Sequence, residues 1–334
     1  MQQRKPDIIK QPIPLILGTF AVAVALLVAR AVRAPLPCEA EVAGVLSSVG
    51  VWFDGLFAHR FWSVAFSVVM TVGSAVVFTR IISRYSISVI RSLIPLVLYC
   101  LLVCGVSYPV GSPSLGLALF LLAHSAELMV GSFRRKAMFD DVMCGSFYAG
   151  LAALLVPDFV WASLLVAYQW SLYRRSAREC VAGGVMWLLP IVPAEFVSWV
   201  ANGRVGIVLE NWGDVLSLPS VLSVNDVVQQ CGGAFGGVLV GVCLLLGVVC
   251  LVAFVAAYGA MRIRARKIHL YFSALFLVGV AMLLLGFPVV VALPIVGMGA
   301  VPLVHTFFVR VPGVWSVTIY IGMLLAVLWR SFVG

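Results

Sequence analysis

A cluster of carboxylate and basic side chains lies in one polar stretch near the start of the chain. Its letters run PCEAEVAGVLSSVGVWFDGLFAHRFW, from residue 37 to residue 62. A carboxylate can act as a general base or bind a divalent cation, and guanidinium or imidazole groups bind phosphate oxygens. The alternative interpretation is an ordinary solvated loop. The candidate bases are Asp54, Glu39 and Glu41, and the candidate phosphate ligands are His59, Arg60 and, from a later polar stretch, Arg204.

Three more polar residues lie inside apolar segments, where a carboxylate costs at least ~2.5 kcal/mol. His124 precedes Glu127 by three residues and shares its helix face, and Glu195 follows a proline in a later segment. One interpretation is a proton or ion pathway. The other is that Glu127 reaches a basic interface near Arg134 while Glu195 reaches water.

The cysteine pattern argues against a metal centre. The eight cysteines include no CxxC pair and no Cys/His cluster. Cys38 and Cys231 could pair in an oxidising compartment. Phosphate-binding, zinc-protease, nucleophile-elbow and dinucleotide motifs are absent from the sequence. We therefore expect no cofactor beyond a possible divalent cation.

The composition indicates a protein that has lipid as its solvent. Of 334 residues, 63% are hydrophobic and 10% are charged, against roughly 25% charged in soluble domains. The net charge of +9 is divided among small clusters between apolar runs, so it indicates membrane orientation and no nucleic-acid partner. Residues 1–334 are expected to form a single membrane-embedded, all-α domain.

Apolar segments that are about long enough to cross a bilayer recur along the chain. We predict a polytopic protein with about eleven transmembrane helices, within a range of ten to twelve. The fifth and sixth segments meet at Pro157 and could instead form a tight helical hairpin. The segments are 15–32, 61–79, 92–108, 114–132, 142–156, 159–173, 181–200, 234–258, 269–287, 289–308 and 314–329.

The distribution of lysine and arginine predicts a cytoplasmic N-terminus. Threading these segments gathers most basic residues into alternate loops, and cytoplasmic loops retain positive charge. Residues 34–60 and 201–233 become the outer loops. Apolar residues recur with helical spacing from Val42 to Phe57, which predicts a short interfacial helix in the first outer loop.

Glycines recur every fourth residue where the 234–258 segment begins. This spacing lines one helix face with hydrogens and lets a neighbouring backbone approach closely. Packing within the chain is one interpretation, and dimerisation or a groove for lipid is the other. The glycines are Gly233, Gly237 and Gly241.

The middle of the chain, about residues 80 to 195, resembles a family of uncharacterised multi-pass inner-membrane proteins of Bacteroidetes. The family pattern has Arg-Ser before Leu-Pro, a small-residue Gly-Leu-Ala helix, a proline between two spans, and Arg-Glu before glycine and proline. The resemblance implies the bacterial inner membrane. The matching residues are Arg91, Ser92, Leu93, Pro95, Gly150, Leu151, Ala152, Pro157, Arg178, Glu179, Gly184 and Pro190.

The architecture as a whole is similar to that of multi-spanning glycosyltransferases that use polyprenyl-phosphate sugars. This similarity implies a role in cell-envelope biogenesis at the periplasmic face, with a lipid-linked substrate and Asp54, Glu39 or Glu41 as base. Two alternatives stand beside it. One is a transporter or flippase that uses Glu127 and Glu195, and the other is a non-catalytic subunit that binds partners through its basic loops or glycine face. The oligomeric state stays open.

Overall fold

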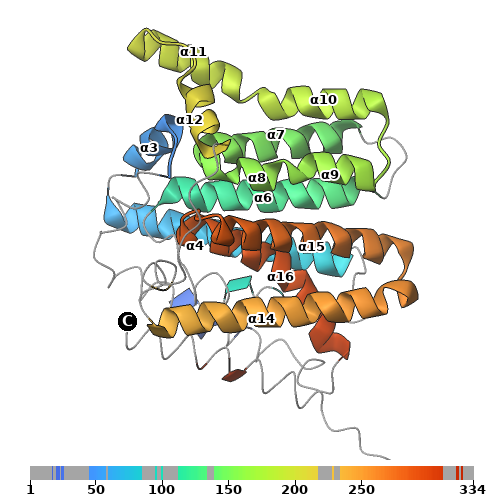
Figure 1. Ribbon diagram of the computed structural model, residues 1–334. Coiled ribbons are helices and arrows are strands. Elements are labelled where there is room, and N and C mark those ends of the chain that lie inside the picture. Colours follow the sequence, from blue (N-terminus) through green and yellow to red (C-terminus); the bar gives the residue numbers. More distant parts are fainter. Residues whose placement is uncertain are drawn as a thin grey trace, which may run out of the picture.

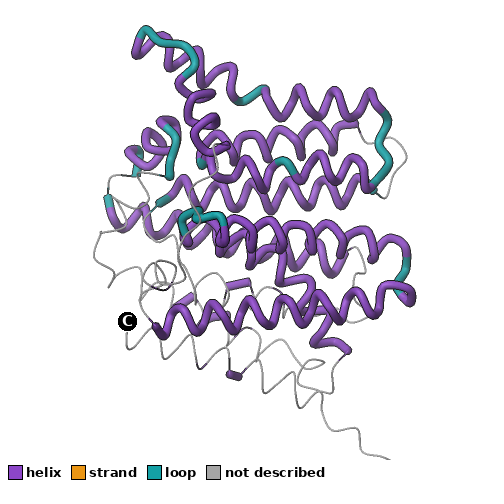
Figure 2. The backbone as a smooth tube through the Cα atoms, in the orientation of Figure 1, coloured by secondary structure: helices purple, strands orange, loops and turns teal. Residues whose placement is uncertain are grey.

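The structure is a computed structural model, and it describes five main stretches of the chain. These are residues 45–57, 59–84, 112–133, 139–216 and 234–310, with isolated residues at 17, 20–22, 24–25, 95, 99–100, 228, 321–322 and 325. Every regular element within them is helical, as Figure 2 shows. The predicted all-α class is therefore confirmed for the described part of the chain.

Four helices pack in series to form one half of the bundle. Helix α4 (Arg60–Arg84) packs on α6 (Pro113–Ser132), α6 on α7 (Phe139–Leu155), and α7 on α10 (Ala177–Leu188). In Figure 1 they lie roughly parallel from the middle of the molecule to its upper edge. Ser112 begins α6 by accepting a hydrogen bond from the Leu115 amide, and Ser176 with Glu179 forms a capping box on α10.

The other half is built around α16 (Val289–Arg310), which packs against α15 (Ile263–Leu284) and α14 (Ala234–Ala257). In the most apolar 18-residue stretch of α16, 94% is buried, whereas in the corresponding stretch of α14 only 22% is buried. Helix α16 is therefore the central helix of this half, whereas α14 presents most of its surface outwards. A 3₁₀ turn, η2 (Tyr258–Ala260), follows α14.

The described residues contain six helices that are long and apolar enough to span a membrane, so the expectation of eleven is not met. The six spans are Phe61–Arg84, Pro113–Ser132, Ala177–Val200, Val240–Ala260, Ile263–Leu284 and Val289–Phe307. The predicted spans 15–32, 92–108 and 314–329 lie mostly outside the described residues. The chain is a multi-pass α-helical membrane protein.

Two predicted spans form a hairpin of shorter helices. Helix α7 has 17 residues, and the 3₁₀ turn η1 (Pro157–Phe159) joins it to α8 (Val160–Ser163) and α9 (Leu165–Leu172). Pro157 begins the turn because its fixed φ suits a first helical position. The predicted spans 142–156 and 159–173 are therefore short or broken helices.

The predicted span 181–200 is divided between α10 and α11 (Ile191–Asn202), which meet at Pro190. A proline removes one helix hydrogen bond and clashes with the preceding turn, so the path bends there. Helix α11 ends at Gly203, which adopts the left-handed conformation with φ of 66°. Helix α12 (Ile207–Leu216) then returns toward the bundle (Figure 1). It lies within the predicted loop 201–233, and the sequence reasoning missed it.

Tight packing at glycines extends to positions that the spacing did not single out. A Cβ atom on Gly299 of α16 would lie 2.3 Å from the Phe276 amide nitrogen, and one on Gly279 would lie 2.7 Å from the Val296 nitrogen. A Cβ atom on Gly237 would lie 2.8 Å from the Val228 side chain, and nothing lies within 4 Å of a Cβ on Gly241. Gly233 lies outside the described residues. Gly279 and Gly299 therefore let α15 and α16 approach closely, whereas on α14 Gly237 lies against Val228 and Gly241 is open.

Candidate functional site

The first polar loop contains the expected helix, α3 (Ser48–Gly55), which docks on the ends of two spans. Ser47 accepts from the Gly50 amide as the N-cap of α3, and its hydroxyl donates to the Leu154 carbonyl at the end of α7. The Ser47 amide donates to the Leu155 carbonyl over 3.2 Å. Helix α3 is therefore fixed to the C-terminus of α7.

Asp54, the candidate base, accepts hydrogen bonds at the N-terminus of α6. Its Oδ1 accepts from the Ser114 amide over 2.7 Å and from the Ser114 hydroxyl, and its Oδ2 accepts from the Ser112 hydroxyl over 2.9 Å. Helix N-termini carry unpaired N–H groups and a positive partial charge, which favour a carboxylate. In this geometry Asp54 joins α3 to α6.

The other residues of this candidate site are not brought together around Asp54. Glu39 and Glu41 lie outside the described residues. His59 is exposed, and its Nδ1 accepts from the Phe61 amide over 3.3 Å. Arg60 is the first residue of α4, and its side chain is not described. Arg204 is exposed between α11 and α12.

Glu127 forms an ion pair with a residue of the neighbouring helix. Its Oε1 lies 2.7 Å from Nη2 of Arg80 on α4, and its Oε2 lies 3.5 Å from Nδ1 of His124. The Glu127 side chain is 4% exposed and that of Arg80 is 56% exposed. The His124 ring stacks on Phe120 at 6.1 Å. Glu127 thus does meet a basic group, contributed by α4, while Arg134 lies outside the described residues.

Glu195 accepts hydrogen bonds from the backbone of the returning helix. Its Oε2 accepts from the Gly206 amide over 2.7 Å, and its Oε1 accepts from the Leu209 amide over 3.2 Å. These amides lie at the start of α12, so the carboxylate caps that helix. These hydrogen bonds join Glu195 to α12, whereas the ion pairs of Glu127 are with residues of α4 and α6.

The end of the bundle that carries α3, η1 and α12, here called the cap end, is closed by buried aromatic packing. Trp212 of α12 is buried against Leu154 and Val160, and its ring lies 5.2 Å from that of Trp187. Asp158 of η1 is also buried, and desolvation raises the pKa of its carboxyl from 3.8 to about 6. Trp212 lies in the loop where the sequence predicted no helix.

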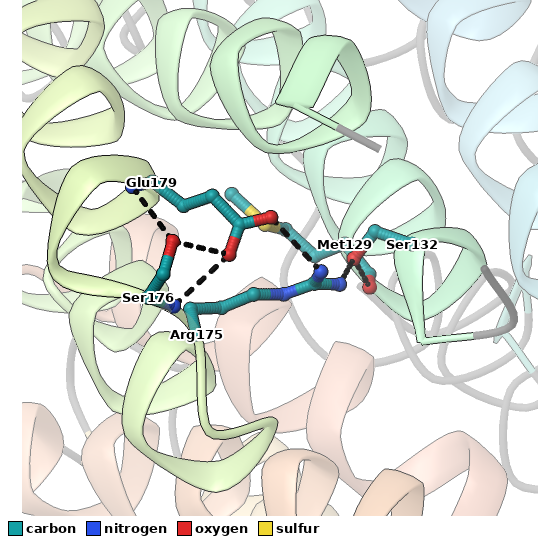
Figure 3. Close-up of polar contacts among 5 residues, drawn as sticks. All are labelled: Met129, Ser132, Arg175, Ser176 and Glu179. Carbon is teal, nitrogen blue, oxygen red and sulfur yellow. Dashed lines mark hydrogen bonds and ion pairs between the residues drawn. The ribbon is translucent and has the colours of Figure 1, made fainter. Parts of the chain in front are cut away.

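The opposite end carries most of the described positive charge and is here called the basic end. In Figure 1 it is the right-hand side, where α9 ends and α15 begins. Figure 3 shows how Arg175 joins the start of α10 to the end of α6: Nη1 lies 3.5 Å from Oε1 of Glu179, and Nη2 donates to the Ser132 hydroxyl. The basic end consists of Arg174, Arg175, Arg178, Arg262, Arg264, Arg266 and Lys267.

A cavity of about 580 Å³ opens at the basic end between α9 and α15. This volume lies within the roughly 300–1,000 Å³ that is usual for small-molecule sites. Its lining combines two cations with hydroxyl and apolar side chains and includes no acid. The lining residues are Tyr168, Ser171, Leu172, Arg174, Ile263 and Lys267. The sequence analysis used these cations for orientation and, in one alternative, for partner binding through the basic loops. It did not predict that they meet, because their meeting requires α9 and α15 to be neighbours.

No group of histidine, cysteine or acidic side chains with the arrangement of a metal site occurs among the described residues. The prediction of a Cys38–Cys231 pair concerns residues outside them. Comparison with known proteins yields no matching family, no matching curated protein and no matching solved structure. Any functional argument therefore rests on the residues of this chain.

Proposed function

We propose that this chain is a non-catalytic membrane protein of the bacterial inner membrane that binds its partner at the basic end. One observation carries the proposal: the carboxylates of Asp54, Glu127 and Glu195 are each engaged in holding helices together. Asp54 and Glu195 accept backbone amides of α6 and α12, and Glu127 pairs with Arg80. The cavity between α9 and α15 lies at the basic end.

The proposal places the basic end in the cytoplasm and the cap end outside. Lysine and arginine are retained on the cytoplasmic side of membrane proteins, and the α9–α10 and η2–α15 turns carry this charge side by side. The choice of the bacterial inner membrane is what the sequence resemblance over residues 80 to 195 implies. Cytoplasmic leaflets are rich in anionic lipids, which suit a basic surface.

The test is complementation of a deletion of this gene, scored by competitive growth against the parent strain. We expect Asp54→Asn, Glu127→Gln and Glu195→Gln to restore growth once their membrane levels match the wild type. A variant with Arg174, Arg262 and Lys267 all changed to Gln should fail at the same level. Failure of Asp54→Asn to restore growth at full expression would contradict a non-catalytic role. Growth with the triple variant would exclude the basic end as the partner-binding surface.

A second candidate function is transfer from a polyprenyl-phosphate-linked sugar at the cap end. The observation that favours it is the docking of α3, which places Asp54 beside the ends of α6 and α7. Such an enzyme would use Asp54, Glu39 or Glu41 as its base. Glu39→Gln and Glu41→Gln test it, because neither change touches the Asp54 hydrogen bonds: loss of complementation by either, with normal expression, would favour this enzyme.

A further inference from the structure

The cavity between α9 and α15 has the lining that an anionic lipid head group requires. Arg174 and Lys267 supply positive charge, and Tyr168 and Ser171 supply hydroxyl groups. The Arg174 guanidinium has no ion-pair partner among the described residues, and its charge repels that of Lys267. Two neighbouring cations without an intervening acid attract an anion, because its charge relieves their repulsion.

Lys267 is held at the cavity wall and keeps donors for a ligand. Its Nζ donates to the Leu172 carbonyl over 2.7 Å and lies 5.2 Å from the centre of the Phe133 ring. An ammonium group has three N–H donors, so the carbonyl occupies one of them. The amine is thereby positioned while part of its hydrogen-bonding capacity stays available.

The backbone at Arg174 shows that this arginine occupies a position that favours glycine. Its φ is 52°, and it is the one non-glycine residue with positive φ in the described part of the chain. The Arg174 amide donates to the Ser171 carbonyl and the Arg175 amide to the Trp170 carbonyl. This is the Schellman pattern, in which glycine usually occupies the left-handed position. An arginine there carries a conformational cost that glycine avoids.

The cavity lies beside one end of a candidate membrane span. Lys267 lies in the second turn of the α15 span, and Arg174 lies in the turn after α9. Ile263, on the same wall, is 68% exposed and apolar. An amphiphile can therefore place its phosphate on the cations while its chains follow Ile263 and Leu172.

We infer that the α9–α15 cavity binds the phosphate of an anionic phospholipid from the leaflet at the basic end. The inference rests on the proposed binding role of that end and names its ligand class. A free inorganic phosphate would satisfy the cations but would leave the apolar wall unused. Each of the two cations that line the cavity, Arg174 and Lys267, should contribute about fivefold to the affinity for the bound phosphate.

The experiment is native mass spectrometry of the full-length protein, released from detergent and titrated with phosphatidylglycerol or with phosphatidylcholine. The wild type should bind phosphatidylglycerol about tenfold or more tightly than phosphatidylcholine. Arg174→Gly should weaken phosphatidylglycerol binding about fivefold while leaving the thermal unfolding temperature unchanged or higher, because glycine relieves the backbone cost. Arg174→Lys should retain most of the binding.

The matched control is Arg178→Gln, which removes one charge at the basic end outside the cavity, where Arg178 lies over the Phe139 ring. Its effect should be less than twofold. Equal weakening by Arg178→Gln and Arg174→Gly would overturn a defined site. Displacement of the lipid by millimolar inorganic phosphate would overturn the lipid as ligand. Either result leaves the complementation test of the basic end unaffected, so the two proposals fail separately.

Discussion

At the scale of single residues, the bonding of Asp54 decides between a structural and a catalytic role. Its two oxygens accept three hydrogen bonds from Ser112 and Ser114. These hydrogen bonds direct the Asp54 carboxylate to the N-terminus of α6, whereas a general base needs a lone pair directed at its substrate. The physical role that follows from the geometry is the attachment of α3 to α6.

Replacement of Asp54 by alanine should lower the free energy of unfolding by ~1–2 kcal/mol, the usual effect of losing an N-cap. Asp54→Asn should lower it by less, because the amide oxygen still accepts one bond. The measurement is unfolding by sodium dodecyl sulfate in mixed micelles. Val51→Ala, on the exposed side of the same helix, is the control and should change it by less than about 0.5 kcal/mol. Unchanged stability in Asp54→Ala would contradict the docking role.

Asp158 should make the free energy of unfolding depend on pH, and its burial determines the direction of that dependence. Because its folded-state pKa is raised from 3.8 to about 6, the folded protein holds its proton more tightly than the unfolded chain does. The free energy of unfolding should therefore fall as pH rises from about 4 to about 6, by up to ~3 kcal/mol.

The check is the thermal unfolding midpoint between pH 4 and pH 7 for the wild type and for Asp158→Asn. Asn cannot ionise, so the variant should lose this fall and be the more stable protein at pH 7. Asp140→Asn changes an exposed carboxyl at the start of α7 and should keep the wild-type profile. A profile that is identical in wild type and Asp158→Asn would show that the carboxyl is not buried in the folded protein.

At the scale of helices, the contact between α15 and α16 depends on the absence of a side chain at two positions. A methyl group on Gly299 would overlap the Phe276 backbone, and α16 cannot shift easily because it is buried on nearly all sides. We expect Gly299→Ala to lower the free energy of unfolding by about 1–3 kcal/mol or more, since overpacking forces the helices apart.

Gly241→Ala on α14 is the matched change, because nothing lies within 4 Å of the added methyl group. Its expected effect is neutral or stabilising by up to about 1 kcal/mol, since alanine favours the helix over glycine. Both variants can be compared by the same micelle unfolding curves. If Gly241→Ala were the more damaging of the two, the α14 face would be a packing surface that the described contacts do not include.

The sequence predicts the helices that consist of one continuous apolar segment long enough to span a membrane. The segments 61–79, 114–132, 234–258 and 289–308 match α4, α6, α14 and α16 within a few residues, except that α4 continues to Arg84. Helix α12 was missed because it is short and amphipathic and follows a polar turn. The division at Pro190 was missed because its two helices together have the length of one span.

The same reasoning could locate candidate site residues without giving their roles. Asp54 was expected on a helix in the first outer loop and does lie on α3, yet its partners Ser112 and Ser114 are 58 and 60 residues away in the sequence. Arg174 and Lys267 were expected on one side of the membrane, and their meeting in a cavity depends on α9 and α15 being neighbours. Such contacts come from tertiary packing, which residue spacing does not encode.

At the scale of the whole molecule, the bundle has two different ends. The cap end is closed by α3, η1 and α12. There Asp54 and Glu195 accept hydrogen bonds from helix N-termini, Asp158 is buried, and Glu210 is exposed. The basic end gathers cations from two turns around an open cavity. In the orientation that we propose, the accessible charge of the basic end lies on the cytoplasmic side, where anionic lipids are concentrated.

The most direct test of this polarity is the labelling of single cysteines by a membrane-impermeant maleimide, in a background in which the eight native cysteines are replaced. Val205 between α11 and α12 and Ala177 at the start of α10 are both exposed and lie at opposite ends. Val205→Cys should be labelled on intact spheroplasts, and Ala177→Cys only after the membrane is permeabilised. The reverse pattern, or labelling of both from the same side, would contradict the proposed placement of the basic end in the cytoplasm.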